Sequence, residues 1–297
     1  MSHMSSGHAG APAPAGTGKK SAGGHSSPPV ILTIAGTDSG GGAGVQADLK
    51  TMTVLGAFGT SAIAALTAQN GAGVLGIHEV PVEFLLLQLE AVRTGFPVRA
   101  AKTGMLASAP LIEALADALA DKDFPLVVDP VCVSQSGHRL LKESAEEAMR
   151  GHMLPLADLL TPNRLEAELL AGMPIKSSLD VARAMDRLFE LGAFAVLLKG
   201  GHFEEYEGRG EMTDWLCERG GAPIPLSHPR VETGNNHGTG CTLSSAIATY
   251  IGFGLPLREA VERAQHFLTR ALASSFCPGI GAGPPNFLGG VGDKALL

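Results

Sequence analysis

Short apolar runs alternate along this chain with segments of helical periodicity. The first run, VILTIA at residues 30–35, is typical of a strand that is buried on both faces. Near the other end, residues 257–272 carry apolar side chains at spacings of three and four, which predicts a helix with one face against a core. Strands that alternate with helices form βαβ units. We therefore expect an α/β fold, a three-layer, doubly wound and mostly parallel sheet with helices on both faces.

The predicted elements follow one another without a linker-like segment. Strands are expected at 30–35, 60–66, 76–80, 100–103, 126–129, 157–160, 194–199 and 212–217, and helices at 44–55, 82–94, 111–120, 143–152, 164–170, 179–191, 243–251 and 257–272. Residues 30–297 are therefore predicted to form a single domain. Residues 1–29 have no acidic residue and no large apolar residue after Met4, so we expect a disordered N-terminal extension.

Composition excludes several classes of protein. The net charge of -7 and the 5% of aromatic residues argue against a nucleic-acid partner. No run approaches the roughly 18 apolar residues of a membrane span. The four cysteines form no CxxC pair, which argues against a zinc site or a disulfide framework and favours a cytoplasmic protein. Cys132, Cys217 and Cys277 are expected to be packing residues.

A glycine-rich segment, SGGGAG at residues 39–44, follows the first predicted strand and opens a helix. Glycines allow a ligand to approach the backbone closely, whereas the simpler interpretation is a tight turn. Residues 42–47 also fit G-x-G-x-x-A, the dinucleotide-binding fingerprint. That motif needs an acidic residue about 20 positions later, and none occurs between Asp48 and Glu79. A nicotinamide-dependent enzyme is therefore disfavoured, and no P-loop motif is present.

A second turn, Gly238-Thr239-Gly240-Cys241, precedes an apolar helical stretch. Unpaired N–H groups and the positive end of the helix dipole would make this turn an anion site. The same position is expected to lower the pKa of the Cys241 thiol. The alternative is a capping turn followed by a small buried cysteine. His237 adjoins the turn and is a further candidate for the site.

Polar residues follow three other predicted strands, at the carboxyl ends of the strands, where ligands bind in such folds. Asp129, Asn163 and Glu166 together resemble the sparse oxygen ligands of Mg²⁺. The simpler interpretation makes Asn163 a helix N-cap and Glu166 a partner of the helix dipole. Lys199 ends its strand, where it either reaches a phosphate or extends to the surface.

These motifs together resemble the hydroxymethylpyrimidine/phosphomethylpyrimidine kinases of thiamine biosynthesis, within the ribokinase-like superfamily. The matching segments, in the family's order, are 34–50, 102–106, 128–131, 136–141, 161–166, 199–202 and 237–242. Cys132 departs from the family's common motif, in which Met often follows Asp-Pro-Val.

The resemblance implies a role for each site residue. The residues assigned to catalysis are Cys241, as general base, with Gly238 and Gly240. Those assigned to the pyrimidine are Gln46, Asp38, Gly44 and Met105. Those assigned to ATP are Lys199, Thr239 and Asn163, and those assigned to Mg²⁺ are Asp129 and Glu166. The resemblance also implies a homodimer.

The implied activity is ATP-dependent phosphorylation of 4-amino-5-hydroxymethyl-2-methylpyrimidine and then of its monophosphate. The alternatives are a pyridoxal or pyridoxine kinase of the same close group and a catalytically silent nucleotide-binding protein. Neither a nucleic acid nor a membrane is expected as a partner.

Overall fold

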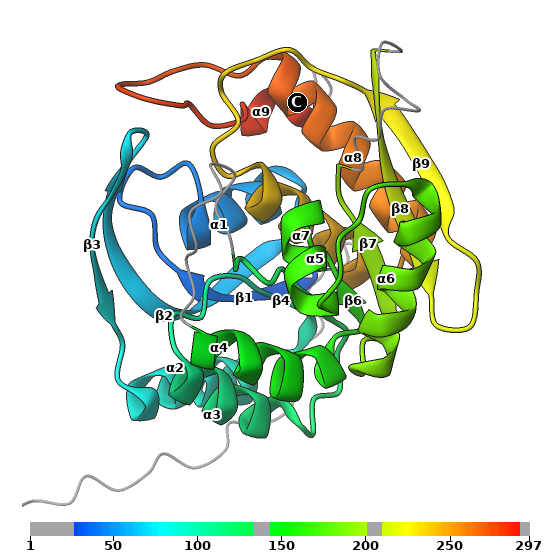
Figure 1. Ribbon diagram of the computed structural model, residues 1–297. Coiled ribbons are helices and arrows are strands. Elements are labelled where there is room, and N and C mark those ends of the chain that lie inside the picture. The colour runs from blue at the N-terminus through cyan, green and yellow to red at the C-terminus, as the bar shows by residue number, and fades with distance from the viewer. Residues whose placement is uncertain (1–26, 133–142, 201–209, 292–297) are drawn as a thin grey trace, which may run out of the picture.

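The computed structural model describes residues 27–132, 143–200 and 210–291. The predicted extension at 1–29, apart from its last three residues, lies outside the described residues, as does the SGHRLL motif at 136–141. The described part contains one nine-stranded sheet in the order β3-β2-β1-β4-β5-β6-β7-β8-β9 (Figure 1). The strands are β1 (Val30–Gly36), β2 (Phe58–Asn70), β3 (Gly73–Glu79), β4 (Val98–Thr103), β5 (Leu126–Val128), β6 (Leu159–Leu160), β7 (Ala195–Leu198), β8 (Glu211–Glu218) and β9 (Ile224–Pro229).

All strand pairs from β2 to β7 are parallel, whereas β3 at one edge and β8 and β9 at the other join antiparallel. This arrangement confirms the predicted α/β fold with a mostly parallel sheet.

Helices cover both faces of the sheet (Figure 1). They are α1 (Gly44–Val54), α2 (Val82–Gly95), α3 (Ala109–Leu119), α4 (Glu143–Ala148), α5 (Arg164–Ala171), α6 (Ser178–Glu190), α7 (Thr239–Gly252), α8 (Leu257–Ala273) and α9 (Phe287–Val291). The packing of strand β1 explains why its sequence is apolar apart from Thr33. Ile31 belongs to the core cluster that includes residues of α1, α7 and α8 on one face, and Leu32 and Ile34 belong to the cluster that includes residues of α2 and α3 on the other.

The structure differs from the predicted elements at several places. Helix α7 begins at Thr239 rather than at residue 243, because Gly238 adopts φ 81° as the N-cap and turns the chain into the helix. Strand β9 was not predicted, since its sequence IPLSHP carries two prolines and lies at a sheet edge. Helix α9 was not predicted either, since its five residues include two glycines.

Two further findings concern earlier expectations. The prediction that Cys277 is a packing residue is wrong, because its side chain is exposed, whereas Cys132 and Cys217 are buried as expected. Among the described residues, none of the helices combines the length and the apolar character needed to span a bilayer.

Candidate active site

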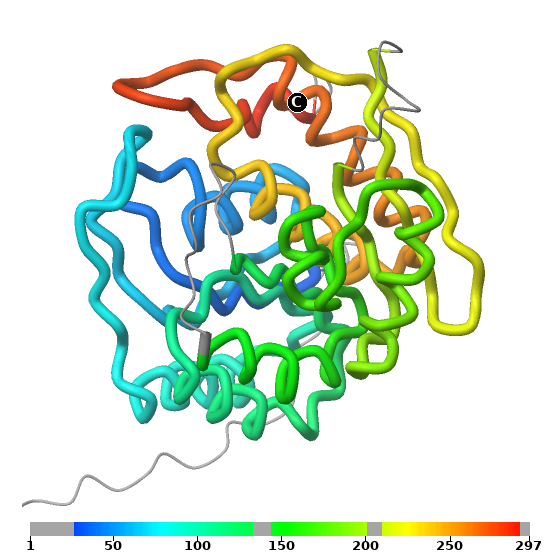
Figure 2. Tube along the Cα trace, viewed as in Figure 1, coloured from blue at the N-terminus to red at the C-terminus, as the bar shows by residue number. Residues whose placement is uncertain are grey.

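The two glycine-rich turns of the sequence lie against each other. A side chain on Gly238 would collide with the carbonyl oxygen of Gly42, and one on Gly42 would collide with the ring of His237. Figure 2 shows the segments that follow these turns, α1 in blue and α7 in gold, side by side although they are far apart in the sequence. Part of the glycine content therefore serves the close approach of one turn to the other.

Asp38 holds the first turn in shape. Its Oδ1 accepts the N–H of Gly40 at 2.8 Å, and its Oδ2 accepts those of Gly42 and Ala43 at 3.0 and 2.8 Å. The Nε2 atom of His237 lies 2.8 Å from the same Oδ2, so the carboxylate also links the two turns. Burial raises the pKa of Asp38, but the bonds from His237 and the backbone outweigh it and the pKa is lowered. Direct contact of Asp38 with a substrate stays a prediction.

Gln46 and Met105 lie near the carboxyl end of β1. The N–H of Asp38 donates to Oε1 of Gln46 at 2.8 Å, which orients the carboxamide with its Nε2 donor at the opposite end. The carbonyl of Met105 accepts the N–H of Gly36 at 3.0 Å, and the Met105 methyl group occupies the space beside Gly36. Gly44 adopts φ 57°, and a side chain there would press on the backbone of Gly36 to Asp38.

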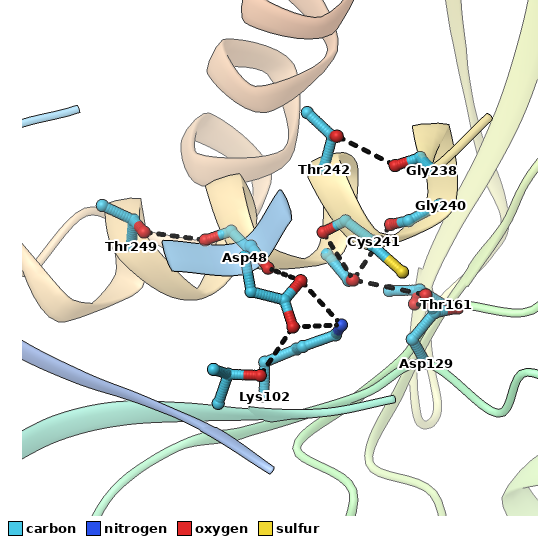
Figure 3. A network of polar contacts seen from close by, with 12 residues as sticks. Asp48, Lys102, Asp129, Thr161, Gly238, Gly240, Cys241, Thr242 and Thr249 are labelled. Carbon is cyan, nitrogen blue, oxygen red and sulfur yellow. Dashed lines mark hydrogen bonds and ion pairs between the residues drawn. The ribbon is translucent and has the colours of Figure 1, made fainter. Parts of the chain in front are cut away.

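Lys199 and Asp129 form an ion pair beside the first turn of α7 (Figure 3 shows Asp129 and the turn). The Lys199 Nζ lies 3.0 Å from Asp129 Oδ1. The other contacts of the carboxylate are longer, 3.4 Å to Thr161 Oγ1 and 3.3 Å to Ser244 Oγ. Burial lowers the pKa of Lys199, but Asp129 and Glu166 outweigh it and raise the pKa. A Cβ on Gly240 would lie 3.4 Å from Nζ, so this ammonium adjoins the predicted anion site.

The pKa of Cys241 differs from the sequence prediction. Burial raises the pKa of this thiol to about 11, and Asp48 and Asp129 act in the same direction. Lys102 and the N–H of Gly44 lower it, but by less. The prediction of a lowered pKa is therefore wrong, because desolvation exceeds the opposing effects of Lys102 and the Gly44 N–H. Cys241 is a protonated thiol at neutral pH.

Asn163 and Glu166 form a capping box at the start of α5. Asn163 Oδ1 accepts the N–H of Glu166 at 3.0 Å, and Glu166 Oε2 accepts the N–H of Asn163 at 2.9 Å. Glu166 Oε1 also accepts the N–H of Cys132 at 3.2 Å. The simpler interpretation of Asn163 as an N-cap is confirmed.

The donor set fits a magnesium ion that keeps most of its water. Asp129 and Glu166 are both buried, Asp129 forms the ion pair with Lys199, and Glu166 lies close enough to raise the pKa of the same ammonium. Within the described ranges, no group of three or more His, Cys, Asp or Glu side chains forms a complete metal cage. Mg²⁺ is commonly bound by one or two carboxylates together with substrate phosphates.

Sequence reasoning assigned no role to one polar cluster. Lys102 and Asp48 are completely buried and lie near Cys241 (Figure 3). Burial lowers the pKa of Lys102, but Asp48 above all outweighs it and the pKa is raised, so the pair is ionic. A lysine between Ala101 and Thr103, inside a predicted strand, was the available signal.

Comparison with known proteins gives a consistent result. A family model described as phosphomethylpyrimidine kinase matches residues 38–286. A hydroxymethylpyrimidine/phosphomethylpyrimidine kinase from Haemophilus influenzae is 45% identical over 258 residues, which cover 86% of this chain and 95% of that protein.

Solved structures extend the comparison. A phosphomethylpyrimidine kinase from Clostridium difficile 630 is 39% identical with a TM-score of 0.72, over 82% of this chain and 99% of that one. A pyridoxal kinase from Staphylococcus aureus, in complex with AMP-PCP and pyridoxal, is 29% identical with a TM-score of 0.78, over 89% and 95% of the two chains. Both likenesses agree with the ribokinase-like fold. Given a family model that covers most of its length and a relative this similar over nearly all of both chains, this protein belongs to the phosphomethylpyrimidine kinase family.

Proposed function

We propose that this protein transfers the γ-phosphoryl group of ATP to 4-amino-5-hydroxymethyl-2-methylpyrimidine and then to the resulting monophosphate, giving the diphosphate. The observation that carries the proposal is the position of the first turn of α7. On one side of this turn lie Lys199 and Asp129, and on the other lies the Gly44 backbone, whose N–H interacts with Cys241. The turn therefore joins a positively charged anion-binding site to the glycine-rich turn that precedes Gln46 in α1.

The pyrimidine side of the site follows from hydrogen-bonding capacity. Gln46 Nε2 is a donor aimed away from the Asp38 bond, and it suits a ring nitrogen of an aminopyrimidine. Gly44 allows the substrate to approach the backbone, and Met105 offers a polarisable apolar contact for the ring. The substrate hydroxymethyl group would then lie at Cys241.

Cys241 orients the hydroxyl rather than acting as a preformed thiolate. Its raised pKa leaves little thiolate at neutral pH. A loose phosphoryl-transfer transition state needs little help from a base, so holding the attacking oxygen in line is the larger contribution.

The nucleotide side rests on positive charge and backbone donors. The Lys199 ammonium and the N–H groups around Gly238, Thr239 and Gly240 would stabilise charge on the transferred phosphoryl. Asn163 lies beside Lys199 through a strand-like bridge, which supports its placement near the nucleotide. When bound, Mg²⁺ held by Asp129 and Glu166 would neutralise charge on the ATP phosphates.

A pyridoxal kinase is the second candidate, favoured by the likeness to the S. aureus enzyme. Pyridoxal also carries a hydroxymethyl group on a heteroaromatic ring. A catalytically silent nucleotide-binding protein is less well supported, since Lys199, Cys241 and Glu166 are all present.

The deciding experiment compares kcat/KM for the pyrimidine, its monophosphate and pyridoxal with one enzyme preparation. We expect the pyrimidine to exceed pyridoxal. A preference for pyridoxal above about tenfold, or roughly 1.4 kcal/mol of transition-state stabilisation, would replace the proposal by the second candidate. ATP hydrolysis that does not depend on the pyrimidine or on pyridoxal would favour the nucleotide-binding protein without kinase activity.

The proposed assembly is a homodimer that buries the β3 edge. All seven residues of β3 are exposed, including Val74, Leu75 and Ile77, and Leu66 on β2 is exposed beside them. An exposed apolar edge strand normally needs a cover, and the family resemblance implies a second copy. Light scattering should give the dimer mass for the native chain and the monomer mass for Leu75→Asp. A monomeric native chain would contradict this.

A further inference from the structure

Asp48 connects four secondary-structure elements at one buried carboxylate. It lies on α1, and it accepts hydrogen bonds from Thr33 on β1 and Ser245 on α7, each at 2.6 Å. Lys102 on β4 donates to both carboxylate oxygens, at 2.9 and 3.0 Å. Asp48, Lys102, Thr33 and Ser245 are all completely buried.

The two helices joined by this carboxylate carry the two halves of the site. Asp48 lies four residues, about one turn, after Gly44 at the start of α1. Ser245 lies four residues after Cys241 in α7. The Ser245–Asp48 bond therefore connects the helices one turn beneath the glycine turn and one turn beneath the anion site.

We propose that the Asp48–Ser245 hydrogen bond, with Asp48 held by Lys102, is a positioning device that sets the register of α7 against α1. It thereby aligns the acceptor hydroxyl with the phosphoryl donor. A misplacement of about 1 Å in such an alignment can cost about a hundredfold in rate. Because neither Asp48 nor Ser245 is exposed, the device acts on alignment and not on ligand contact. This inference rests on the proposed phosphotransfer function.

Thr33 supplies a matched control. The Ser245→Ala and Thr33→Val substitutions each remove one 2.6 Å hydrogen bond to the same carboxylate, and both positions are fully buried. Only Ser245 connects the two helices of the site, since Thr33 connects α1 to the sheet. A merely structural role predicts similar effects of both substitutions on activity.

The test measures kcat, the KM values for ATP and for the pyrimidine, and the melting temperature of the Ser245→Ala and Thr33→Val variants. We expect Ser245→Ala to lower kcat at least about tenfold, with both KM values within about threefold of the native values. Thr33→Val should keep kcat within about twofold. Equal losses of kcat in the two variants, or a Ser245→Ala effect confined to KM, would overturn the proposal.

Two further measurements guard against misfolding and against an error in the proposed function. In the background Asp48→Leu/Lys102→Met, which removes the pair, adding Ser245→Ala should have no further effect on kcat, whereas an additional tenfold loss would overturn the proposal. Alkylation of Cys241 by iodoacetamide needs no substrate, and Cys277→Ser removes the exposed thiol. In the Cys277→Ser background, Ser245→Ala should accelerate alkylation of Cys241 about threefold, and Thr33→Val should not. Equal alkylation rates in the two variants would overturn the proposed positioning role, even if the enzyme acts on a different substrate.

Discussion

Two lysines, Lys102 in β4 and Lys199 directly after β7, are each paired with a buried carboxylate, yet the two pairs differ in how completely they are enclosed. Both side chains of the Lys102–Asp48 pair are 0% exposed, whereas Lys199 and Asp129 are 15% and 4% exposed. Asp48 receives four short hydrogen bonds, between 2.6 and 3.0 Å. Asp129 has one bond of 3.0 Å and two longer contacts of 3.3 and 3.4 Å.

The difference indicates that the fully enclosed pair stabilises the fold, whereas the partly enclosed pair is suited to binding a ligand. A buried pair with every bond made is expensive to break and has no capacity for a ligand. A pair with loose contacts at the edge of the site can exchange them for phosphate oxygens and a hydrated cation. We call these the closed pair (Lys102–Asp48) and the open pair (Lys199–Asp129).

The largest expected effect is on the closed pair. Lys102→Met leaves the Asp48 carboxylate buried without its cation, so the free energy of unfolding should fall by about 3–5 kcal/mol. Asp48→Leu/Lys102→Met should recover more than half of that loss, because no charge then remains buried. Urea denaturation measures both variants; a double variant as unstable as the single one would show that the ion pair itself is not the cause.

A smaller loss of stability is expected from the open pair. Lys199→Met should lower the free energy of unfolding by less than about 2 kcal/mol, because Lys199 is 15% exposed and water can enter in its place beside Asp129. The same denaturation experiment applies, with Lys102→Met as the reference. Equal losses at the two lysines would remove the distinction between the pairs.

The Cys241 thiol, which lies near both pairs, should lose its proton only at high pH. Because burial raises the pKa of Cys241 to about 11 from 9.0, alkylation in a Cys277→Ser background should increase with pH up to a midpoint near 11. A folded-state pKa above the unfolded value contributes stability that is complete below pH 9 and is lost as the pH rises through about 11. Cys241→Ser should lack this alkaline loss. An alkylation midpoint below pH 8 would restore the thiolate interpretation.

The smallest effect should come from the link between the two glycine turns. His237→Ala removes one of four bonds to Asp38, and the three backbone N–H bonds remain. We expect a loss of about 1 kcal/mol in stability and a severalfold rise in the pyrimidine KM. The lowered pKa of Asp38 contributes stability above pH 3.8 that is lost as the pH falls through the folded-state value. Acid unfolding of His237→Ala should therefore occur at higher pH than that of the native chain; an unchanged transition would contradict this.

The fold could be predicted from the sequence because burial on both faces leaves near-continuous apolar runs, as in β1 and β7. That Asp129, Asn163 and Lys199 lie close together could also be predicted. These residues follow parallel strands, and so they meet at the carboxyl ends of those strands. Strand β9 could not, because its prolines and exposed side chains give no strand pattern.

Other features of the site depend on tertiary contacts that no spacing reveals. The pKa of Cys241 is raised by burial, lowered by Lys102 and raised by Asp48, and both charged residues lie far away in sequence. The Lys102–Asp48 pair likewise forms only because the fold places β4 and α1 side by side, which no spacing in the sequence shows. The His237–Asp38 bond, which joins the two turns, belongs to the same class.

The most direct test of the difference between the two pairs is calorimetric titration with ADP of the native chain, Lys199→Met and Asp48→Leu/Lys102→Met. The open pair is proposed to bind nucleotide phosphates, so Lys199→Met should raise the ADP Kd at least about tenfold, or roughly 1.4 kcal/mol. The variant without the closed pair should bind ADP within about threefold of the native chain while its kcat falls at least about tenfold. Native ADP affinity in Lys199→Met, together with weakened binding in the other variant, would contradict the account.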